Sequence, residues 1–178
     1  MVLGWCCSRG TIGAHVRVVL PRALAVLTVL AIAAVQAGTG SATFTGSTKL
    51  AVKGCGTARD PFSAVVAAAG DGTWNATSPG EQFSGTYTTI GPGRRLKLTP
   101  DAATLANLTD VVVGGVSSLC RTGGVTVTSI RPQTSMLTLN RKLTRAKLLV
   151  RYVFAGTAGG RSGTATLTVR AAGPWTPQ

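Results

Sequence analysis

The sequence has very few residues suited to acid–base or metal chemistry. Its only histidine is His15, near the N-terminus. In the rest of the chain this absence excludes Ser-His-Asp and Cys-His nucleophile systems, histidine-ligated zinc, and general-base catalysis by histidine. The triplet Gly91-Pro92-Gly93 lacks a following helix, so it does not fit the pattern of a phosphate-binding loop.

Acidic residues are also scarce, with only five in 178 positions. Hydrolysis by paired carboxylates needs two of them facing one cleft, about 5 to 10 Å apart. Four of the five have a structural reason for their place: Asp71 and Glu81 lie in turns, Asp101 lies at an expected helix start, and Asp60 precedes a proline. Only Asp110 lacks one. A carboxylate-dependent hydrolase is therefore the least favoured function, and we expect no enzyme, no metal site and no cofactor.

Cysteine is limited to four residues, of which Cys6 and Cys7 fall in the N-terminal segment. The other two, Cys55 and Cys120, lie 65 positions apart. In an exported protein they would meet an oxidising compartment, which favours a disulfide. Free thiols or metal ligands are the alternative, but the chain has neither a CxxC motif nor a nearby histidine.

Residues 1–37 have the pattern of a secretory signal peptide. Basic residues precede the apolar run 23–34, which is too short to span a membrane, and small residues follow it. Cleavage is expected after Ala37, or after Ala42. We expect a secreted, periplasmic or cell-envelope protein with no transmembrane segment once the signal is removed. The prevalence of Ala, Gly, Val and Thr suggests a bacterial genome of high GC content.

Beyond this leader, apolar and polar residues alternate with period two, which is typical of strands. Asp71-Gly72 and the turns at 78–80 and 91–93 separate successive runs and predict hairpins between sequence neighbours. One segment differs: Thr99 as N-cap and Pro100 as first helical residue predict a helix near 100–112, and Gly114-Gly115 interrupts its apolar stripe.

These patterns predict one all-β domain over residues 38–170. About eight to nine antiparallel strands and one helix near 100–112 would form either a small barrel or a two-sheet sandwich. The last residues, 171–178, are expected to form a loose tail, with Trp175 exposed or folded back.

Three short motifs, DGTW at 71–74, SGTYTTIG at 84–91 and RRLKL at 94–98, resemble a group of uncharacterised small secreted bacterial β-proteins. That group has a DGTW hairpin, an SGTYT strand, a basic LxLT strand, an amphipathic helix ending in Cys and a final β meander. The resemblance implies no catalytic residues. The triplet Gly72-Thr73-Trp74 also resembles, more weakly, the Gly-x-Trp motif of lipocalin-like domains, although here it lies on a later strand than the first.

Basic residues dominate the charge. The whole chain has a formal net charge of +13, and residues 38–178 keep 15 basic side chains against five acidic ones, a net charge of +10. Such a domain attracts anionic envelope polymers or lipid headgroups, although basic strand faces also protect edges from pairing. No nucleic acid partner is expected for an exported chain without an aromatic RNA-binding strand. The possible anion-binding surface comprises Arg94, Arg95, Lys97, Arg141, Lys142, Arg145, Lys147 and Arg151.

Five aromatic residues are candidates for either a pocket or the core: Trp74, Phe83, Tyr87, Tyr152 and Phe154. Tyr152 and Phe154 share a strand face with Leu148 and Val150, so core packing is the simpler expectation. If a barrel closes around a cavity, the same residues would line it.

Two functions thus remain. The leading hypothesis is a secreted, non-enzymatic binding or envelope-associated domain that acts through its basic surface. The alternative is a lipocalin-like carrier of a small apolar or anionic ligand, with Trp74 and Tyr87 near its pocket. An internal cavity of several hundred Å³ would favour the carrier, whereas a packed core with a continuous basic face would favour the first.

Overall fold

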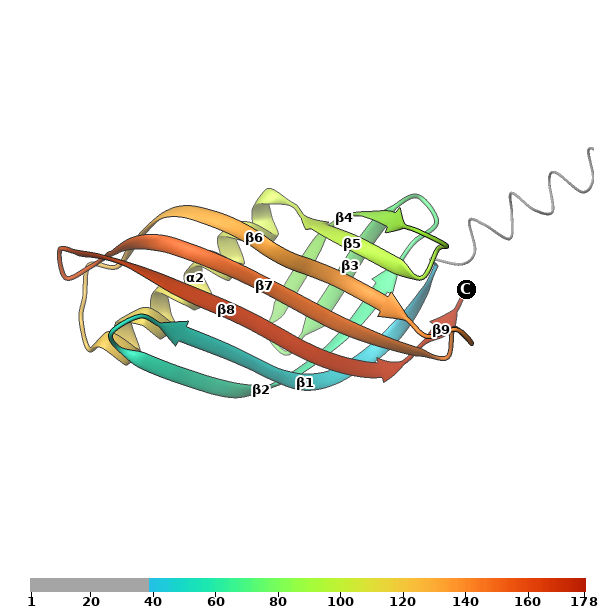
Figure 1. Ribbon diagram of the computed structural model, residues 1–178, viewed down its shortest axis with the longest axis horizontal. Coiled ribbons are helices and arrows are strands. Elements are labelled where there is room, and N and C mark those ends of the chain that lie inside the picture. The colour runs from blue at the N-terminus through green and yellow to red at the C-terminus, as the bar shows by residue number, and fades with distance from the viewer. Residues whose placement is uncertain (1–38) are drawn as a thin grey trace, which may run out of the picture.

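The chain forms a closed antiparallel β-barrel in a computed structural model, which describes residues 39–178 (Figure 1). The predicted signal peptide, residues 1–37, lies outside the described residues. Strands β2 to β8 pair in chain order, and β1 closes the ring by pairing with both β8 and β2. The all-β prediction is confirmed, in its barrel form. The strands are β1 (Gly40–Val52), β2 (Gly56–Ala68), β3 (Thr73–Ser78), β4 (Glu81–Ile90), β5 (Arg95–Pro100), β6 (Thr126–Leu139), β7 (Arg145–Ala158), β8 (Arg161–Pro174) and β9 (Thr176–Pro177).

Inward and outward side chains alternate along the strands, as their pattern predicts. In β7, Leu148 and Tyr152 are buried, whereas Lys147 and Arg151 are exposed. The predicted Asp-Gly hairpin joins β2 to β3, with Gly72 at a φ of 84°, a left-handed conformation that glycine adopts without strain.

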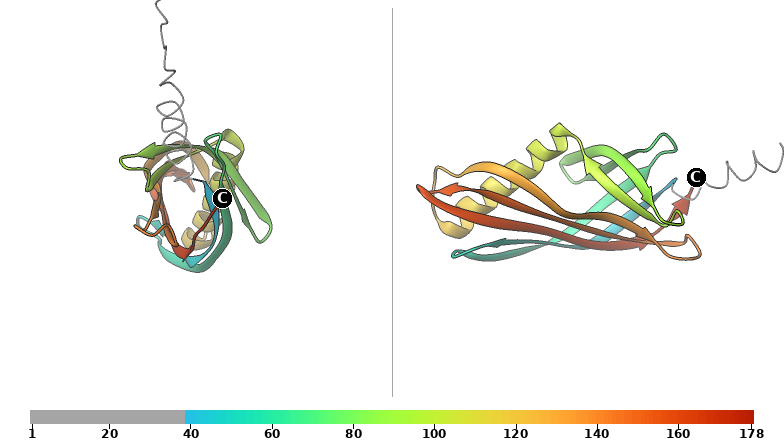
Figure 2. Two further views of the ribbon diagram at one scale, coloured as in Figure 1. Left: turned by 90° about the vertical axis from the view of Figure 1, so that its right-hand side faces the viewer. Right: turned by 45° about the horizontal axis from the view of Figure 1, so that its top comes forward.

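The barrel is completed by strands at one end and by a helix at the other. β2 pairs with β3 only over Val65–Ala68, and β5 pairs with β6 only over Arg95–Lys97. The first halves of β2 and β6 therefore have no strand between them. Helix α2 (Ala102–Cys120) lies against this part of the barrel and runs behind β6, β7 and β8 in Figure 1. The view along the long axis in Figure 2 (left) shows the strands as a ring.

The helix begins later than the sequence predicts. Pro100 is the last residue of β5, where it pairs with Gly85, so it cannot be the first helical residue. Asp101 replaces Thr99 as the N-cap, and its carboxylate accepts a hydrogen bond from the Thr104 amide at 2.7 Å. Because Pro100 belongs to the strand, the N-cap moves from the predicted Thr99 to Asp101.

The helix also continues past Gly114-Gly115, where the sequence predicts an interruption of its apolar stripe. A Cβ at Gly115 would overlap the side chain of Leu50 in β1. This glycine therefore allows α2 to approach the barrel closely and does not end the helix. α2 ends at Cys120, and its disulfide to Cys55, with an S–S distance of 2.07 Å, joins the helix to the turn between β1 and β2.

The C-terminal residues lie in strands and do not form the expected loose tail, but Trp175 is folded back, which was one of its two expected placements. Trp175 is buried, and its indole ring packs so closely on Gly40 that no side chain would fit there. The Trp175 amide donates a hydrogen bond to the Thr144 carbonyl at 2.9 Å, and β9 pairs with the first residues of β1. Burial of a large indole together with this backbone pairing offsets the entropy of a free tail.

Two clusters of buried side chains occupy the two ends of the barrel. The first lies where β3, β4 and β5 complete the wall, and it includes Phe44, Trp74 and Leu96. The second lies under α2 and includes Val112 and Tyr152. By length and composition alone α2 could cross a membrane, but its buried face packs on this second cluster, as a helix covering a core does.

Candidate functional site

A cavity of about 400 Å³ lies inside the barrel, and both buried clusters contribute to its walls. Its lining comes from all eight barrel strands and from α2. Small-molecule sites in proteins commonly measure about 300 to 1,000 Å³. The apolar lining includes Phe62, Val66, Leu98, Leu148, Leu167 and Val169.

Three of the five predicted aromatic residues line this central cavity: Trp74, Phe83 and Tyr152. The Trp74 indole N–H donates to the Thr99 carbonyl at 3.4 Å, which orients the ring from β3 towards β5. Burial raises the pKa of the Tyr152 hydroxyl, and a hydrogen bond with the Ser135 side chain opposes this shift. Tyr152 and Ser135 therefore place a neutral polar pair among the mainly apolar residues of the wall.

The cavity lining reaches the surface between β2, the β3–β4 turn and α2. Its exposed members are Asp60 and Pro61 on β2, Pro79 and Glu81 at the turn, and Val111 on α2. Two of the five carboxylates of the chain thus lie at this mouth, although their sequence context indicates only a local structural role for each.

Helix α2 is held at both ends, so this wall of the cavity is preformed. At its start the Thr104 hydroxyl donates to the Ser84 carbonyl at 2.9 Å and accepts from the Ser84 amide at 2.7 Å. The Ser84 hydroxyl also donates to Asp101. That bond, followed by the one from the Thr104 amide, lowers the pKa of the Asp101 carboxyl. At its end α2 is fixed by the disulfide between Cys55 and Cys120.

The other two predicted aromatic residues lie elsewhere. Tyr87 packs on the edge of the first cluster, and its hydroxyl donates to the Ala69 carbonyl at 2.6 Å, bracing the β2–β3 turn. Burial raises the pKa of Tyr87, and the Asp71 carboxylate adds to this. Phe154 lines a second cavity of about 580 Å³, near the disulfide, which shares no lining residue with the central one.

The predicted basic residues lie on strands and turns of the outer surface. Cross-strand register places Arg95 and Lys147 on either side of Thr138. Arg141 and Lys142 lie in the β6–β7 turn. Of the eight, Arg94 is partly buried, and the other seven, Arg95, Lys97, Arg141, Lys142, Arg145, Lys147 and Arg151, are exposed.

The fold extends this basic surface with Lys49, Arg59 and Arg170, which lie outside the predicted set. One cross-strand row runs from Arg151 through Thr168 and Lys49 to Arg59, across β7, β8, β1 and β2. Arg170 lies opposite Leu149 in the neighbouring row. The alternation within each strand places these cations outward, but only the barrel order makes them neighbours. All five carboxylates lie between residues 60 and 110, none of them on β1 or on β5 to β8.

Among residues 39–178, no group of three or more His, Cys, Asp or Glu side chains lies close enough together to hold a metal ion. Comparison of the chain with models of protein families, with curated proteins and with solved structures found no match.

Proposed function

We propose that the protein is a non-enzymatic carrier that binds a small, mainly apolar molecule in the central cavity. The observation that supports this most directly is the cavity itself, with about 400 Å³ of space among apolar side chains. Protein interiors are normally packed as densely as organic crystals, and atoms around a void lose dispersion contacts. A bound apolar molecule would restore those contacts.

The mouth of the cavity indicates how such a ligand would lie. Its apolar body would pack among Trp74, Phe83 and Tyr152, and its polar end would face solvent beside Asp60 and Glu81. These carboxylates would repel an anionic headgroup at this opening. The central cavity therefore favours a neutral ligand, or one whose polar end donates hydrogen bonds.

The disulfide supports the expected site of action. Disulfides persist in oxidising compartments, and Cys55 is bonded to Cys120 here. We infer a carrier that works outside the cytoplasm, in agreement with the signal peptide expected at residues 1–37.

Fluorescence titration with the neutral apolar probe N-phenyl-1-naphthylamine tests the carrier. Ala76 lines the cavity on β3, so Ala76→Phe would place a phenyl ring in the ligand's space. Ala67 lies on the neighbouring β2 and does not line the cavity, which makes Ala67→Phe a matched control. Circular dichroism and urea denaturation would confirm that both variants are folded.

The proposal predicts saturable, one-to-one probe binding by the unaltered protein. Ala76→Phe should weaken this binding by about tenfold or more, equivalent to about 1.4 kcal/mol, while Ala67→Phe should change it less than about twofold. Equal affinities for the two variants, or no saturable binding by the unaltered protein, would contradict the proposal.

A second function, attachment to anionic envelope polymers or lipid headgroups, is supported by the basic row of Arg151, Lys49 and Arg59. Cosedimentation with vesicles containing phosphatidylglycerol tests it. Binding that persists at about 0.5 M salt, where the Debye length is only about 4 Å, would indicate direct contacts. Complete loss of vesicle binding at this salt concentration would mean that any binding at low salt is due only to long-range electrostatic attraction.

A further inference from the structure

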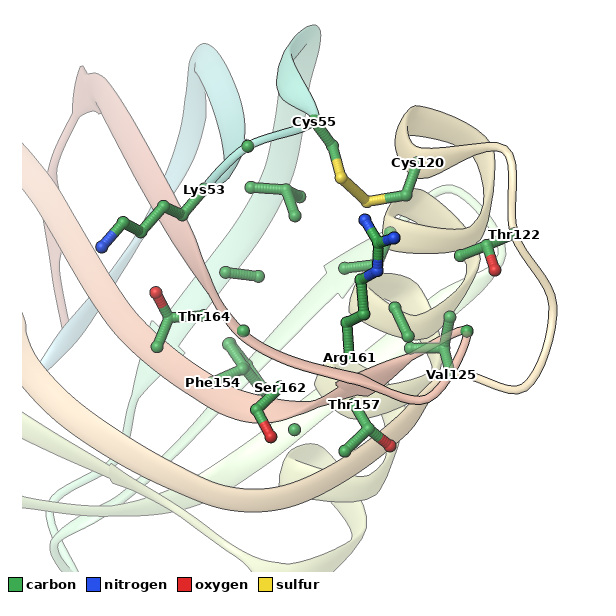
Figure 3. A pocket seen from close by; sticks show the side chains of 18 of the residues that line it. Lys53, Cys55, Cys120, Thr122, Val125, Phe154, Thr157, Arg161, Ser162 and Thr164 are labelled. Atoms are coloured by element: carbon green, nitrogen blue, oxygen red, sulfur yellow. A yellow bond between two sulfur atoms is a disulfide. The ribbon is translucent and has the colours of Figure 1, made fainter.

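The second cavity is separate from the carrier site in place and in chemistry. Its volume is about 580 Å³, and it lies where the β1–β2 turn, the end of α2 and the β7–β8 hairpin meet. Figure 3 shows the disulfide and the β8 residues around this opening. We call it the end cavity.

The floor of the end cavity is apolar. Val112 and Val116 of α2 and Phe154 of β7 line it, and all three are buried. The ring of Phe154 lies 6.4 Å from that of Tyr152, centroid to centroid, and Tyr152 belongs to the central cavity. This pair of aromatic rings contributes to the layer between the two cavities.

The rim of the end cavity is cationic. Lys53, Arg121 and Arg161 line it together with several hydroxyl groups, and no carboxylate is among its described lining residues. In Figure 3 the Arg161 side chain rises from β8 and points towards the disulfide. The three cations come from three separate segments, namely the residue after β1, the residue after α2 and the first residue of β8.

At the end of α2, the Ser117 carbonyl is capped by the backbone. A helix C-terminus carries partial negative charge and orphan carbonyl groups that attract basic side chains. Here the Ser117 carbonyl accepts from the backbone N–H groups of Arg121 and Thr122, with Arg121 in the left-handed conformation at a φ of 51°. Because backbone groups cap this carbonyl, the side chains of Arg121 and Arg161 are not needed for it.

From this arrangement we propose that the end cavity binds a small amphiphilic anion, a carboxylate with an apolar chain. The carboxylate lies at the rim, where Arg161 can donate two parallel hydrogen bonds and Lys53 adds positive charge. The apolar chain packs on Val112, Val116 and Phe154. This chemistry is opposite to that of the central cavity, whose mouth carries two carboxylates.

Isothermal titration calorimetry with decanoate and with neutral decanol tests the proposal on the full mature protein. Arg161→Gln removes the guanidinium and keeps a polar side chain. Arg170→Gln makes the same charge change on an exposed residue of the same strand that does not line the cavity. Lys53→Gln is a second, independent variant at the rim, and Ala76→Phe blocks only the central cavity.

In the Ala76→Phe background, where the central cavity is filled, decanoate should bind more tightly than decanol. Arg161→Gln should weaken decanoate binding about tenfold and Lys53→Gln by a few-fold, as expected for lost charge-assisted hydrogen bonds. Arg170→Gln and Ala76→Phe should leave it within about twofold. Absence of decanoate binding, equal losses for Arg161→Gln and Arg170→Gln, or loss only in Ala76→Phe would each overturn the proposal. These results do not bear on the carrier proposal, because the weaker binding of N-phenyl-1-naphthylamine expected for Ala76→Phe is measured separately.

Discussion

Gly114 and Gly115 are neighbours in α2, but a methyl group at each position would meet different surroundings. A Cβ at Gly114 would have open space, whereas one at Gly115 would overlap Leu50, which is buried. Gly114→Ala should raise the free energy of unfolding by about 1 kcal/mol, the difference in helix propensity. Gly115→Ala gains the same helix propensity, but overpacking against Leu50 should cost about 1 to 3 kcal/mol. Its free energy of unfolding should therefore change by an amount between about zero and a loss of about 2 kcal/mol.

Urea denaturation followed by tryptophan fluorescence measures this difference directly. With a slope of about 2 kcal/mol per molar urea, the midpoint of Gly114→Ala should exceed that of Gly115→Ala by roughly 0.5 to 1.5 M. When each glycine substitution is made separately in a Leu50→Ala background, the two midpoints should become similar. The shorter side chain at position 50 then leaves room for the Cβ at position 115. Equal midpoints in the unaltered background would refute the close approach of α2 to β1.

Three further predictions concern stability and processing. Replacing both Cys55 and Cys120 with serine should lower the free energy of unfolding by about 4 kcal/mol, because the loop they close spans 65 residues; a loss below about 1 kcal/mol in urea denaturation would argue against the entropic account. The pKa of Asp101 is lowered in the folded state, chiefly by Ser84, so its stabilisation is present above the unfolded pKa, near pH 4, and disappears as the pH falls through the lowered value. Asp101→Asn should therefore flatten the decline in melting temperature between about pH 5 and pH 2, and an unchanged slope would contradict this. If the expected signal peptide is removed, mass spectrometry of the processed chain should find Gly38 as the first residue, because cleavage after residue 42 would remove the start of β1 that pairs with β9. A processed chain that begins at residue 43 would contradict this prediction.

The strands could be predicted from the sequence because each one has a local pattern. Outward Lys147 and Arg151 alternate with inward Leu148 and Tyr152, and the period-two rule identifies both faces of β7. Closure of the barrel has no such local signal, because it depends on β1 pairing with strands at both ends of the chain order. The sequence pattern therefore does not distinguish a barrel from a sandwich.

The errors at α2 and at the C-terminus have tertiary causes. A glycine pair ordinarily weakens a helix, but Gly115 is needed where α2 meets β1. Trp175 gave only a partial signal, because a large indole favours burial but does not by itself distinguish an exposed ring from one that is folded back. Its partner surface at Gly40 lies at the other end of the described chain and has no pattern that identifies it.

The candidate sites were only partly predictable. The alternation of β3 and β7 places Trp74 and Tyr152 inward, but it cannot distinguish a lining residue from a packed one. The cationic rim of the end cavity was missed because its members come from separate segments. The predicted disulfide offered a clue, because Lys53 lies two positions before Cys55 and Arg121 directly follows Cys120. Joining the cysteines therefore brings the two segments that carry these residues to the same cavity.

Native mass spectrometry of the mature protein purified from its own host tests the carrier most directly. The account predicts a population whose mass exceeds that of the disulfide-bonded chain by one small molecule, which apolar solvent releases and which Ala76→Phe no longer retains. A single species at the mass of the bare chain, identical for the unaltered protein and for Ala76→Phe, would contradict the claim that the central cavity holds a ligand.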